Sequence, residues 1–549
     1  MTAALTGSIE GLQTVLCEKT AMVGGTTSTS AGTVWIPGSS QSVAAGVPDR
    51  LDDARQYLNS VIGPEGQAER DAFLRTGPAV LDYLEAQTEV KFLAAKAHPD
   101  YLGNHPGAAY GGRALSAPSF DGRKLGEDFR RVRPPRPEFV IFGGMMVAKA
   151  DIPFLLRPFA SLKAFAHVLR MVLRYAVDRL GYSRGTHLVM GNALVGRLLY
   201  SLKQRNVPIR YETSLVDLVI ENGAVIGAVI AGPNGRRSVG CRKGAILATG
   251  GVGWNQRLRA DLFPSQGREH SLSLETNSAD GIEAALRSGG TLDKPLASAA
   301  LWMPSSILTR PDGTRSVFPH IVLDRAKPGL IAVNKSGRRF ANEANSYHDF
   351  VLGMLDADHE TPSIPAYLLC DRSFIRDYGL GLVHPGTRNL KPFIKAQYLI
   401  EAHSLSELAQ RIGAVPDVLQ RTVASHNRFA QTGIDEEFGR GSTDLNRING
   451  DPDNKPNPCL RPIGPGPFFA VAVWPADLAS SAGIGTDGAG RVLRDDGSAI
   501  SGLYACGNDA ASIFRGTYPG PGTTIGPGMV FAWRAVMDAK VRKVGPEVI

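Results

Sequence analysis

A short segment near the start of the chain carries residue types that could bind a nucleotide. The apolar run Thr14–Cys17 ends in Glu18, and a set of glycine and hydroxyl residues follows: Gly24, Gly25, Thr26, Thr27, Ser30 and Gly32. A carboxylate at the end of a strand can accept hydrogen bonds from ribose hydroxyls. Glycine N–H groups beside threonine hydroxyls suit a pyrophosphate and a ribityl chain, which need several donors at close range. A Ser/Thr turn without a ligand, and a surface acid at residue 18, are the alternatives.

The elements around Glu18 have the order of the second half of a βαβ unit. Residues 2–11 predict a short helix that ends near Gly11, and residues 14–17 predict a strand. A dinucleotide-binding fold places a first strand and a GxGxxG turn before such a helix, and no such pattern precedes Thr2. We therefore expect a fold that is incomplete at the N-terminus. Either the natural protein starts upstream, or this chain binds its cofactor weakly.

One GxGxxG pattern does occur, at residues 483–488, but its context is wrong for a nucleotide loop. Residues 491–497 read as strand and turn, whereas the nucleotide loop must open a helix. The pattern predicts a hairpin.

The remaining signals predict an α/β protein with a discontinuous, Rossmann-like nucleotide-binding domain and an inserted α+β substrate domain. Asn222-Gly223 between apolar runs predicts a β-hairpin, residues 245–251 predict a buried strand that enters a glycine turn, and residues 526–541 predict a helix. We expect three segments: 1–299 in the nucleotide domain, 300–475 in the substrate domain, and 476–549 back in the nucleotide domain.

The composition excludes several classes of protein. The net charge of +8 comes from scattered Lys and Arg, which does not favour nucleic-acid binding. The cysteines lie far apart and form no CxxC pair, so no metal site is predicted. Scattered, odd cysteines suit a reducing cytoplasm. No apolar run is long enough to span a membrane.

Four segments together resemble the FAD-containing fumarate reductase and 3-ketosteroid dehydrogenase superfamily. They follow the family order at residues 18–32, at Ala248-Thr249-Gly250-Gly251, at residues 337–343 and at residues 502–509. A fifth segment, Tyr518-Pro-Gly-Pro-Gly522 with its continuation to residue 528, resembles the 3-ketosteroid delta-1-dehydrogenase branch. A plain turn would explain the Pro-Gly repeat but not the tyrosine before it or the helix after it.

The resemblance implies FAD as the cofactor. No histidine lies near residues 24–32, so non-covalent FAD is expected. Thr524 and Ile525 would open the last helix, whose partial positive charge would face the flavin N1–O2 edge. Asp509 would bind a ribityl hydroxyl. The remaining cofactor-binding positions are Glu18, Gly24, Gly25, Thr26, Thr27, Ser30, Gly32, Val216, Thr249, Gly250, Gly251, Gly507 and Asn508.

The resemblance also implies desaturation of a 3-ketosteroid between C1 and C2. The Tyr518 O–H and the Gly522 N–H would hold the C3 oxygen, and a Cβ at residue 522 would crowd the ketone. Tyr347 would take the C2 proton as a phenolate, and the C1 hydride would go to flavin N5. A free tyrosine has a pKa of about 10, so a neighbouring tyrosine must lower it. Tyr101 is our choice, with Tyr110 as the alternate.

Other interpretations remain open. Tyr347 and Tyr101 could be buried structural residues, and His320 and His348 are expected to be structural. A 4-dehydrogenase or a desaturase of a smaller cyclic enone would use the same loop. A fumarate-type reductase would need Arg325 and Arg339 to bind its substrate. A flavin-poor fragment that binds sterols is the alternative from another class. The electron acceptor is not indicated.

One stretch suggests a contact with the membrane. Residues 159–174 carry apolar residues at helical spacing with basic residues between them. A surface helix packed on the core is one interpretation. The other is a helix that rests on the inner face of the cell membrane, where a sterol dissolves.

Overall fold

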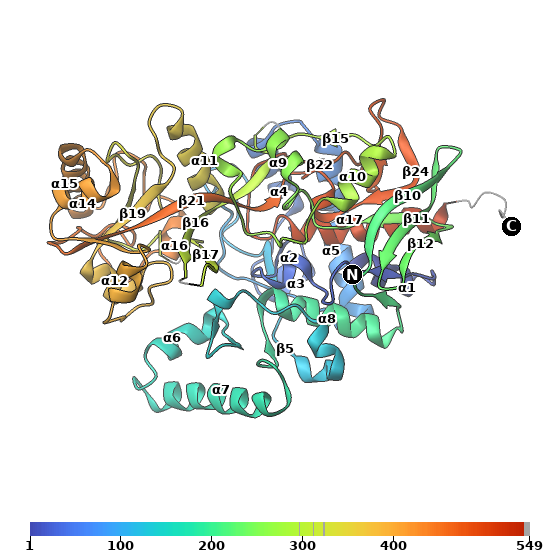
Figure 1. The fold of residues 1–549 in the computed structure, drawn as a ribbon, viewed down its shortest axis with the longest axis horizontal. Coiled ribbons are helices and arrows are strands. Elements are labelled where there is room, and N and C mark those ends of the chain that lie inside the picture. The colour runs from blue at the N-terminus through green and yellow to red at the C-terminus, as the bar shows by residue number, and fades with distance from the viewer. Residues whose placement is uncertain (296, 311, 322–323, 543–549) are drawn as a thin grey trace.

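The computed structural model describes residues 1–549 except 296, 311, 322–323 and 543–549. One six-stranded sheet builds the nucleotide side, at the right of Figure 1. Its main path is β10 (Ser214–Glu221), β11 (Ala224–Gly232), β24 (Ala499–Ala505) and β13 (Ala245–Leu247). β24 runs parallel to both β11 and β13, so strands from the two ends of the chain share this sheet. The mixed α/β class and the discontinuous nucleotide domain are confirmed.

Two predicted hairpins are present. Asn222 and Gly223 join β10 to β11 with φ of 50° and 74°, the left-handed conformation that a tight two-residue turn requires. Residues 483–488 contain β22 (Gly483–Ile484) and lead directly into β23 (Arg491–Leu493), with Thr486 bridged to Val492. The GxGxxG pattern there is therefore a hairpin and not a nucleotide loop.

A seven-stranded sheet forms the other half of the molecule, at the left of Figure 1. The long strand β21 (Phe468–Ser480) pairs with β16 (Ala300–Thr309) on one side and β19 (Ala366–Asp371) on the other. The outer strands are β17 (Arg315–Pro319), β18 (Leu330–Val333), β14 (His270–Ser271) and β20 (Ile400–Ala402). Helices α11 (Tyr347–Asp358), α14 (Leu405–Ile412) and α15 (Pro416–Thr432) accompany this sheet. The expected boundaries at 299/300 and 475/476 stay predictions.

Helices from both ends of the chain pack together on the nucleotide side. The last helix, α17 (Ile525–Val541), contacts α1 (Thr2–Ile9), α5 (Gln67–Gln87) and the strand β2 (Thr33–Trp35). α8 (Met190–Gln204) contacts α1 and α2 (Gly25–Ser28). These contacts bury one large apolar cluster that includes Leu5, Trp35 and Phe73.

Two parallel strand edges remain unpaired within the described residues. β1 (Leu16–Cys17) pairs only with β9 (Ile209–Arg210), and β13 pairs only with β24. Residues of both strands line the same cavity. Val15 is 42% exposed, although strands of a parallel sheet are normally covered on both faces. The expected absence of a first strand with its GxGxxG turn stays a prediction.

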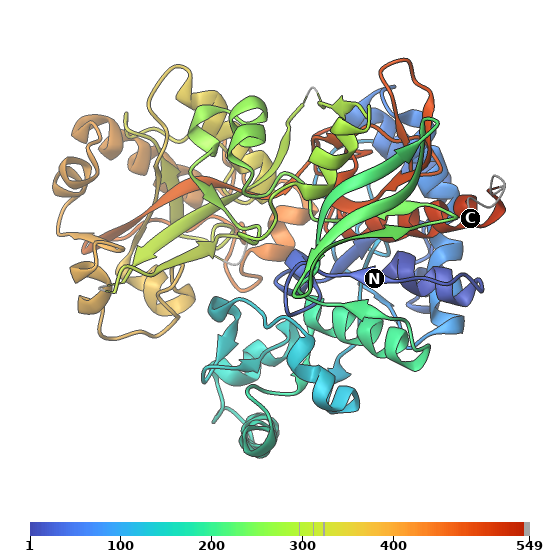
Figure 2. The same ribbon diagram turned by 45° about the vertical axis from the view of Figure 1, so that its right-hand side comes forward.

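A helical arm stands away from the body, at the bottom of Figures 1 and 2. It comprises α6 (Ile152–Leu156) and α7 (Leu162–Gly181). Ser161 caps α7 by accepting the Ala164 N–H, so the predicted amphipathic helix is present but begins three residues later and extends further. The described part of the chain contains no helix long and apolar enough to cross a membrane.

Candidate active site

Three tyrosines from distant parts of the chain meet in one cluster, in which Tyr347 and Tyr518 are buried and Tyr101 is partly buried. Tyr101 lies in the loop after β3 (Leu93–Ala94), Tyr347 is the first residue of α11, and Tyr518 lies in the loop before α17. The ring centroids are 5.6 Å apart for Tyr101–Tyr347, 5.6 Å for Tyr101–Tyr518 and 5.3 Å for Tyr347–Tyr518. The alternate, Tyr110, is 52% exposed. The fold therefore gathers Tyr101, and not Tyr110, with the other two.

Burial dominates the acid–base properties of these phenols. It raises the pKa of Tyr347 well above its ordinary value, and the Tyr101 and Tyr518 phenols raise it further. Burial also raises the pKa of Tyr101 and of Tyr518. The Tyr101 hydroxyl approaches the Tyr347 hydroxyl at 3.4 Å, longer than the roughly 2.5–3.0 Å of an ordinary O–H···O bond. The expectation that Tyr101 lowers the pKa of Tyr347 is therefore wrong.

The loop that carries Tyr518 packs closely against β2, and this close approach requires glycine at two of its positions. Gly522 has φ of +95°, and a Cβ there would lie 2.5 Å from the Thr33 carbonyl oxygen. A Cβ at Gly520 would lie 2.6 Å from the Trp35 indole nitrogen. The Gly522 carbonyl accepts the Trp35 N–H at 3.2 Å. Glycine is thus required at 522 by the β2 backbone behind the loop, in addition to the ketone expected in front of it.

The Gly522 N–H is available to a ligand. Within the described residues it donates to no protein acceptor, whereas the Gly522 carbonyl also accepts the Gly526 N–H in the first turn of α17. Gly522, Tyr518, Tyr347 and Tyr101 all line one cavity. A hydroxyl and an amide N–H from one rigid loop can hold a carbonyl oxygen and stabilise negative charge on it.

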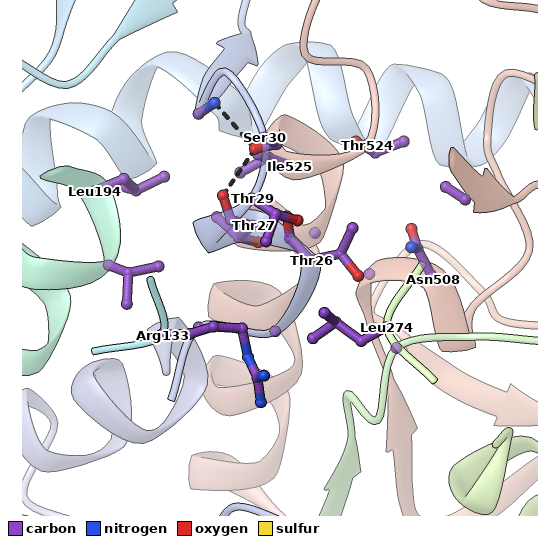
Figure 3. A pocket seen from close by; sticks show the side chains of 18 of the residues that line it. Thr26, Thr27, Thr29, Ser30, Arg133, Leu194, Leu274, Asn508, Thr524 and Ile525 are labelled. Carbon is purple, nitrogen blue, oxygen red and sulfur yellow. Dashed lines mark hydrogen bonds between the residues drawn. The ribbon is translucent and has the colours of Figure 1, made fainter. Parts of the chain in front are cut away.

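A single cavity of ≈2410 Å³ joins the tyrosine cluster to the predicted cofactor residues. Ordinary ligand pockets measure roughly 300–1,000 Å³, so the volume suits a dinucleotide with a second ligand. Figure 3 shows Thr26, Thr27, Ser30, Asn508, Thr524 and Ile525 around part of it. The other predicted cofactor residues on its wall are Glu18, Gly24, Gly25, Gly32, Thr249, Gly250 and Gly507.

The backbone around this cavity fits a flavin nucleotide. A Cβ added at Gly25 or Gly507 would meet nothing within 4 Å, so a ligand can approach the main chain closely at both places. Glu18 accepts the Thr20 N–H and hydroxyl with one carboxylate oxygen, Oε1. Thr524 and Ile525 begin the 17-residue helix α17, whose N-terminus favours negative charge beside it.

Three predicted cofactor residues do not line the cavity: Val216, Gly251 and Asp509. The Val216 carbonyl accepts from Arg287 at 2.9 Å. Gly251 packs against Ser480 and Asn508. The fully buried Asp509 carboxylate accepts the N–H groups of Thr249 at 2.5 Å and Gly251 at 2.8 Å. It therefore braces the Thr249–Gly251 turn, and its role toward the ribityl chain stays a prediction.

Arg133 is a site residue that the sequence analysis missed. Figure 3 shows it beside the cavity wall that contains Thr26 and Leu274. Its guanidinium donates to the Thr20 hydroxyl at 2.8 Å, next to Glu18. A scattered arginine carries no motif of its own, and only the pairing of Val23 with Val132 brings it to this place.

The two arginines considered as ligands for a dicarboxylate substrate bind other protein groups instead. Arg325 is fully buried and donates to the carbonyls of His320 and Glu343. Arg339 pairs with Glu343 and Asp435 at 2.8 Å each. Neither lines the cavity. The two histidines are structural as expected: His320 contacts Asp324 and Ser306, and His348 lies between the Trp302 N–H and the Gly516 carbonyl.

Comparison with known proteins agrees with this geometry. The model of the family described as "FAD binding domain" matches residues 1–525. A 4-oxocyclohex-2-ene-1-carboxylate 5-dehydrogenase of Sinomonas cyclohexanicum is 36% identical over 98% of this chain and 91% of its own length. A 3-oxosteroid 1-dehydrogenase of Mycolicibacterium smegmatis is 35% identical over 98% of this chain and 95% of its own.

A solved structure shows the same fold over nearly the whole chain. The crystal structure of 3-ketosteroid delta1-dehydrogenase from Sterolibacterium denitrificans, in complex with 1,4-androstadiene-3,17-dione, has a TM-score of 0.91. It is 30% identical and covers 99% of this chain and 97% of its own. On the matched family model and on these relatives, the chain belongs to the FAD-binding family of flavoprotein oxidoreductases that includes the 3-oxosteroid 1-dehydrogenases.

Proposed function

We propose that the protein desaturates a 3-ketosteroid between C1 and C2. The observation that carries this proposal is the placement of the three clustered tyrosines and the free Gly522 N–H on the wall of the FAD cavity. Relatives over almost the whole chain are 3-oxosteroid 1-dehydrogenases, and the similar crystal structure holds a 3-ketosteroid.

The residues of the chain divide the chemistry between them. The Tyr518 O–H and the Gly522 N–H hold the C3 oxygen and stabilise the charge that develops on it. Tyr347 first loses its own O–H proton to solvent and then, as the phenolate, accepts the C2 proton; the Tyr101 hydroxyl is placed to donate to the Tyr347 oxygen. Bound FAD supplies the acceptor for the hydride that leaves C1. Because burial disfavours a free phenolate at Tyr347, proton removal depends on strong polarisation of the ketone.

The second candidate is a smaller substrate, a 4-oxocyclohexene carboxylate, which the name of the Sinomonas relative specifies. A carboxylate needs a cation beside the ring. Arg136 lines the cavity, but it faces Glu138 at 3.7 Å and donates to the carbonyls of Leu272 and Val317. Three apolar side chains that line the cavity pack with the tyrosine cluster: Leu272, Met303 and Ile321. This lining favours a large neutral ketone.

An anaerobic titration tests the proposal. The purified protein should show a flavin spectrum, and androstenedione should bleach the flavin band with formation of the 1,2-alkene. Tyr518→Phe should slow bleaching about 100-fold or more, as expected for loss of one oxyanion donor. Faster bleaching with 4-oxocyclohexene carboxylate would select the second candidate, and a 4,5-alkene product would select a 4-dehydrogenase. Unchanged turnover by Tyr518→Phe would overturn the chemistry.

We further propose that α7 rests on an anionic membrane surface. Its exposed face carries Leu162, Phe165, Leu169, Leu173, Val177 and Leu180, with exposed fractions between 44% and 89%. The basic residues Lys163, Arg170 and Arg179 are exposed on the same helix. An apolar stripe with flanking cations is the pattern of a helix that lies in the plane of the interface. The enzyme would thereby take up the steroid directly from the membrane in which it dissolves.

Vesicle sedimentation tests this contact. The protein should bind phosphatidylglycerol vesicles, and L169E/L173E should abolish binding without changing turnover of dissolved steroid. Ile434→Glu, at a residue 64% exposed elsewhere on the surface, is the matched control and should bind as before. Equal sedimentation of all three proteins would refute the membrane contact.

A further inference from the structure

Tyr57 stands directly behind the tyrosine cluster without touching the cavity. It lies in α4 (Leu51–Ile62) and is 0% exposed. Tyr101 and Tyr518 line the cavity, whereas Tyr57 does not. Any part that Tyr57 plays in the reaction must therefore act through the residues in front of it.

The Tyr57 hydroxyl joins the two loops that carry Tyr101 and Tyr518. It donates to the Pro519 carbonyl at 2.6 Å and accepts the Leu102 N–H at 3.2 Å. The same Pro519 carbonyl accepts the Tyr101 N–H at 2.8 Å. One phenol hydroxyl and one direct backbone bond thus close a ring between residues 101–102 and residue 519. Each partner is the immediate neighbour of an active-site tyrosine or the tyrosine itself.

Arg113 and the loop after Tyr101 both pack against Tyr57. The Arg113 guanidinium lies 5.7 Å from the Tyr57 ring centroid and forms ion pairs with Asp49 at 2.9 Å and Asp100 at 2.6 Å. The loop after Tyr101 also packs on the α4 backbone, since a Cβ at Gly107 would lie 2.2 Å from the Asp53 carbonyl oxygen and 2.9 Å from the Tyr57 backbone nitrogen. Tyr57 is therefore anchored well enough to hold residues 101–102 at a fixed distance from residue 519.

The geometry excludes a direct chemical role for this phenol. Its one proton and one acceptor position are both taken by backbone groups. Burial and the nearby Asp100 carboxylate also raise the pKa of Tyr57. It neither exchanges a proton with the cavity nor reaches a ligand there.

On the basis of the proposed desaturation, we infer that Tyr57 is a positioning residue that sets the distance between the Tyr101–Tyr347 pair and the ketone-binding Tyr518–Gly522 loop. The reaction needs proton removal at C2 and polarisation at C3 in one bound ketone. The two sets of groups come from different loops, and the Tyr57 hydroxyl fixes one loop against the other.

Tyr57→Phe removes this bridge with almost no change of volume. We expect kcat per bound flavin to fall roughly 10- to 100-fold, the scale of small misplacements in catalytic geometry, while KM stays within about twofold because Tyr57 touches no ligand. Deuterium uptake at C2 of recovered androstenedione in D₂O should fall by the same factor. A variant with p-aminophenylalanine at residue 57 keeps a donor toward Pro519 and should recover most of the rate.

Tyr83→Phe is the matched control. Tyr83 is a hydrogen-bonded tyrosine of the same half of the molecule, with its hydroxyl on Glu10 at 2.6 Å. It should keep the wild-type kcat per flavin. If Tyr57→Phe lowers only flavin content or melting temperature and leaves kcat and C2 exchange per flavin unchanged, the inference is wrong. If the wild-type flavin is not bleached by androstenedione at all, the proposed function fails first, independently of the variant.

Discussion

Replacement of Gly522 by alanine gives the sharpest test of how the ketone-binding loop is built. A Cβ at this position would meet the Thr33 carbonyl oxygen at 2.5 Å and the Trp35 nitrogen at 2.8 Å. Both are backbone atoms of β2, which is buried and cannot yield as a flexible side chain does. Ordinary contact begins at 3.4 Å, so the loop must retreat by about 0.9 Å. The φ of +95° adds strain, since residues with a Cβ rarely adopt it.

A shift of this size acts on the reaction rather than on FAD binding. A misplacement of about 1 Å can cost roughly 100-fold in rate, which corresponds to about 2.7 kcal/mol in the activation free energy. We therefore expect the rate of anaerobic flavin reduction by androstenedione to fall about 100-fold in Gly522→Ala, with flavin content retained. Stopped-flow absorbance at the flavin band measures it.

Gly497→Ala separates the clash from the backbone conformation. Gly497 has φ of +78°, and a Cβ there would meet nothing within 4 Å. This control should lose some stability and keep its rate. A wild-type rate in Gly522→Ala would show that the loop is not held by β2 in the way described, and the reasoning would fail.

Three further predictions concern the buried titratable groups Tyr347, Asp349 and Asp509. Burial raises the pKa of Tyr347, so flavin reduction should accelerate with pH from about 7 to about 10, and a plateau reached below about pH 8 would contradict this. Burial raises the pKa of Asp349 to about 6. The folded state therefore binds this proton more tightly than the unfolded state, and the free energy of unfolding falls as pH rises from about 4 to about 6. Asp349→Asn should therefore raise the melting temperature more at pH 7.5 than at pH 4.5, whereas an equal shift at both would count against it. Asp509→Ala leaves the Thr249 and Gly251 N–H groups without their acceptor, at about 1–3 kcal/mol each; scanning fluorimetry should show a lower melting temperature and weaker FAD retention, and an unchanged profile would refute the bracing role.

Local signals carried much of the fold prediction. The Asn222-Gly223 turn and the start of α17 depend on the conformations of a few consecutive residues, and such preferences are readable in sequence. The hairpin at residues 483–488 was recognised because a strand signal, and not a helix signal, followed the glycines. Most of the residues predicted to bind the cofactor line the cavity, because they follow strand ends or open helices.

Contacts between distant segments lay beyond such signals. Tyr101 and Tyr347 stand 246 positions apart, and their shared burial reversed the expected direction of the Tyr347 pKa. The Asp509 carboxylate accepts hydrogen bonds from the Thr249–Gly251 turn. Arg325 and Arg339 take part in buried hydrogen bonds and ion pairs.

The amino-acid sequence alone indicated the α/β class, the FAD family and the tyrosines and glycines proposed to bind a ketone. Only the tertiary structure decided which tyrosine completes the cluster, that β2 forces glycine at 522, that Arg133 lines the cavity, and that Tyr57 bonds to the loops of Tyr101 and Tyr518. Backbone preferences and motifs act over a few residues, whereas distances, burial and pKa shifts are properties of packed neighbours that the chain brings together from hundreds of residues away.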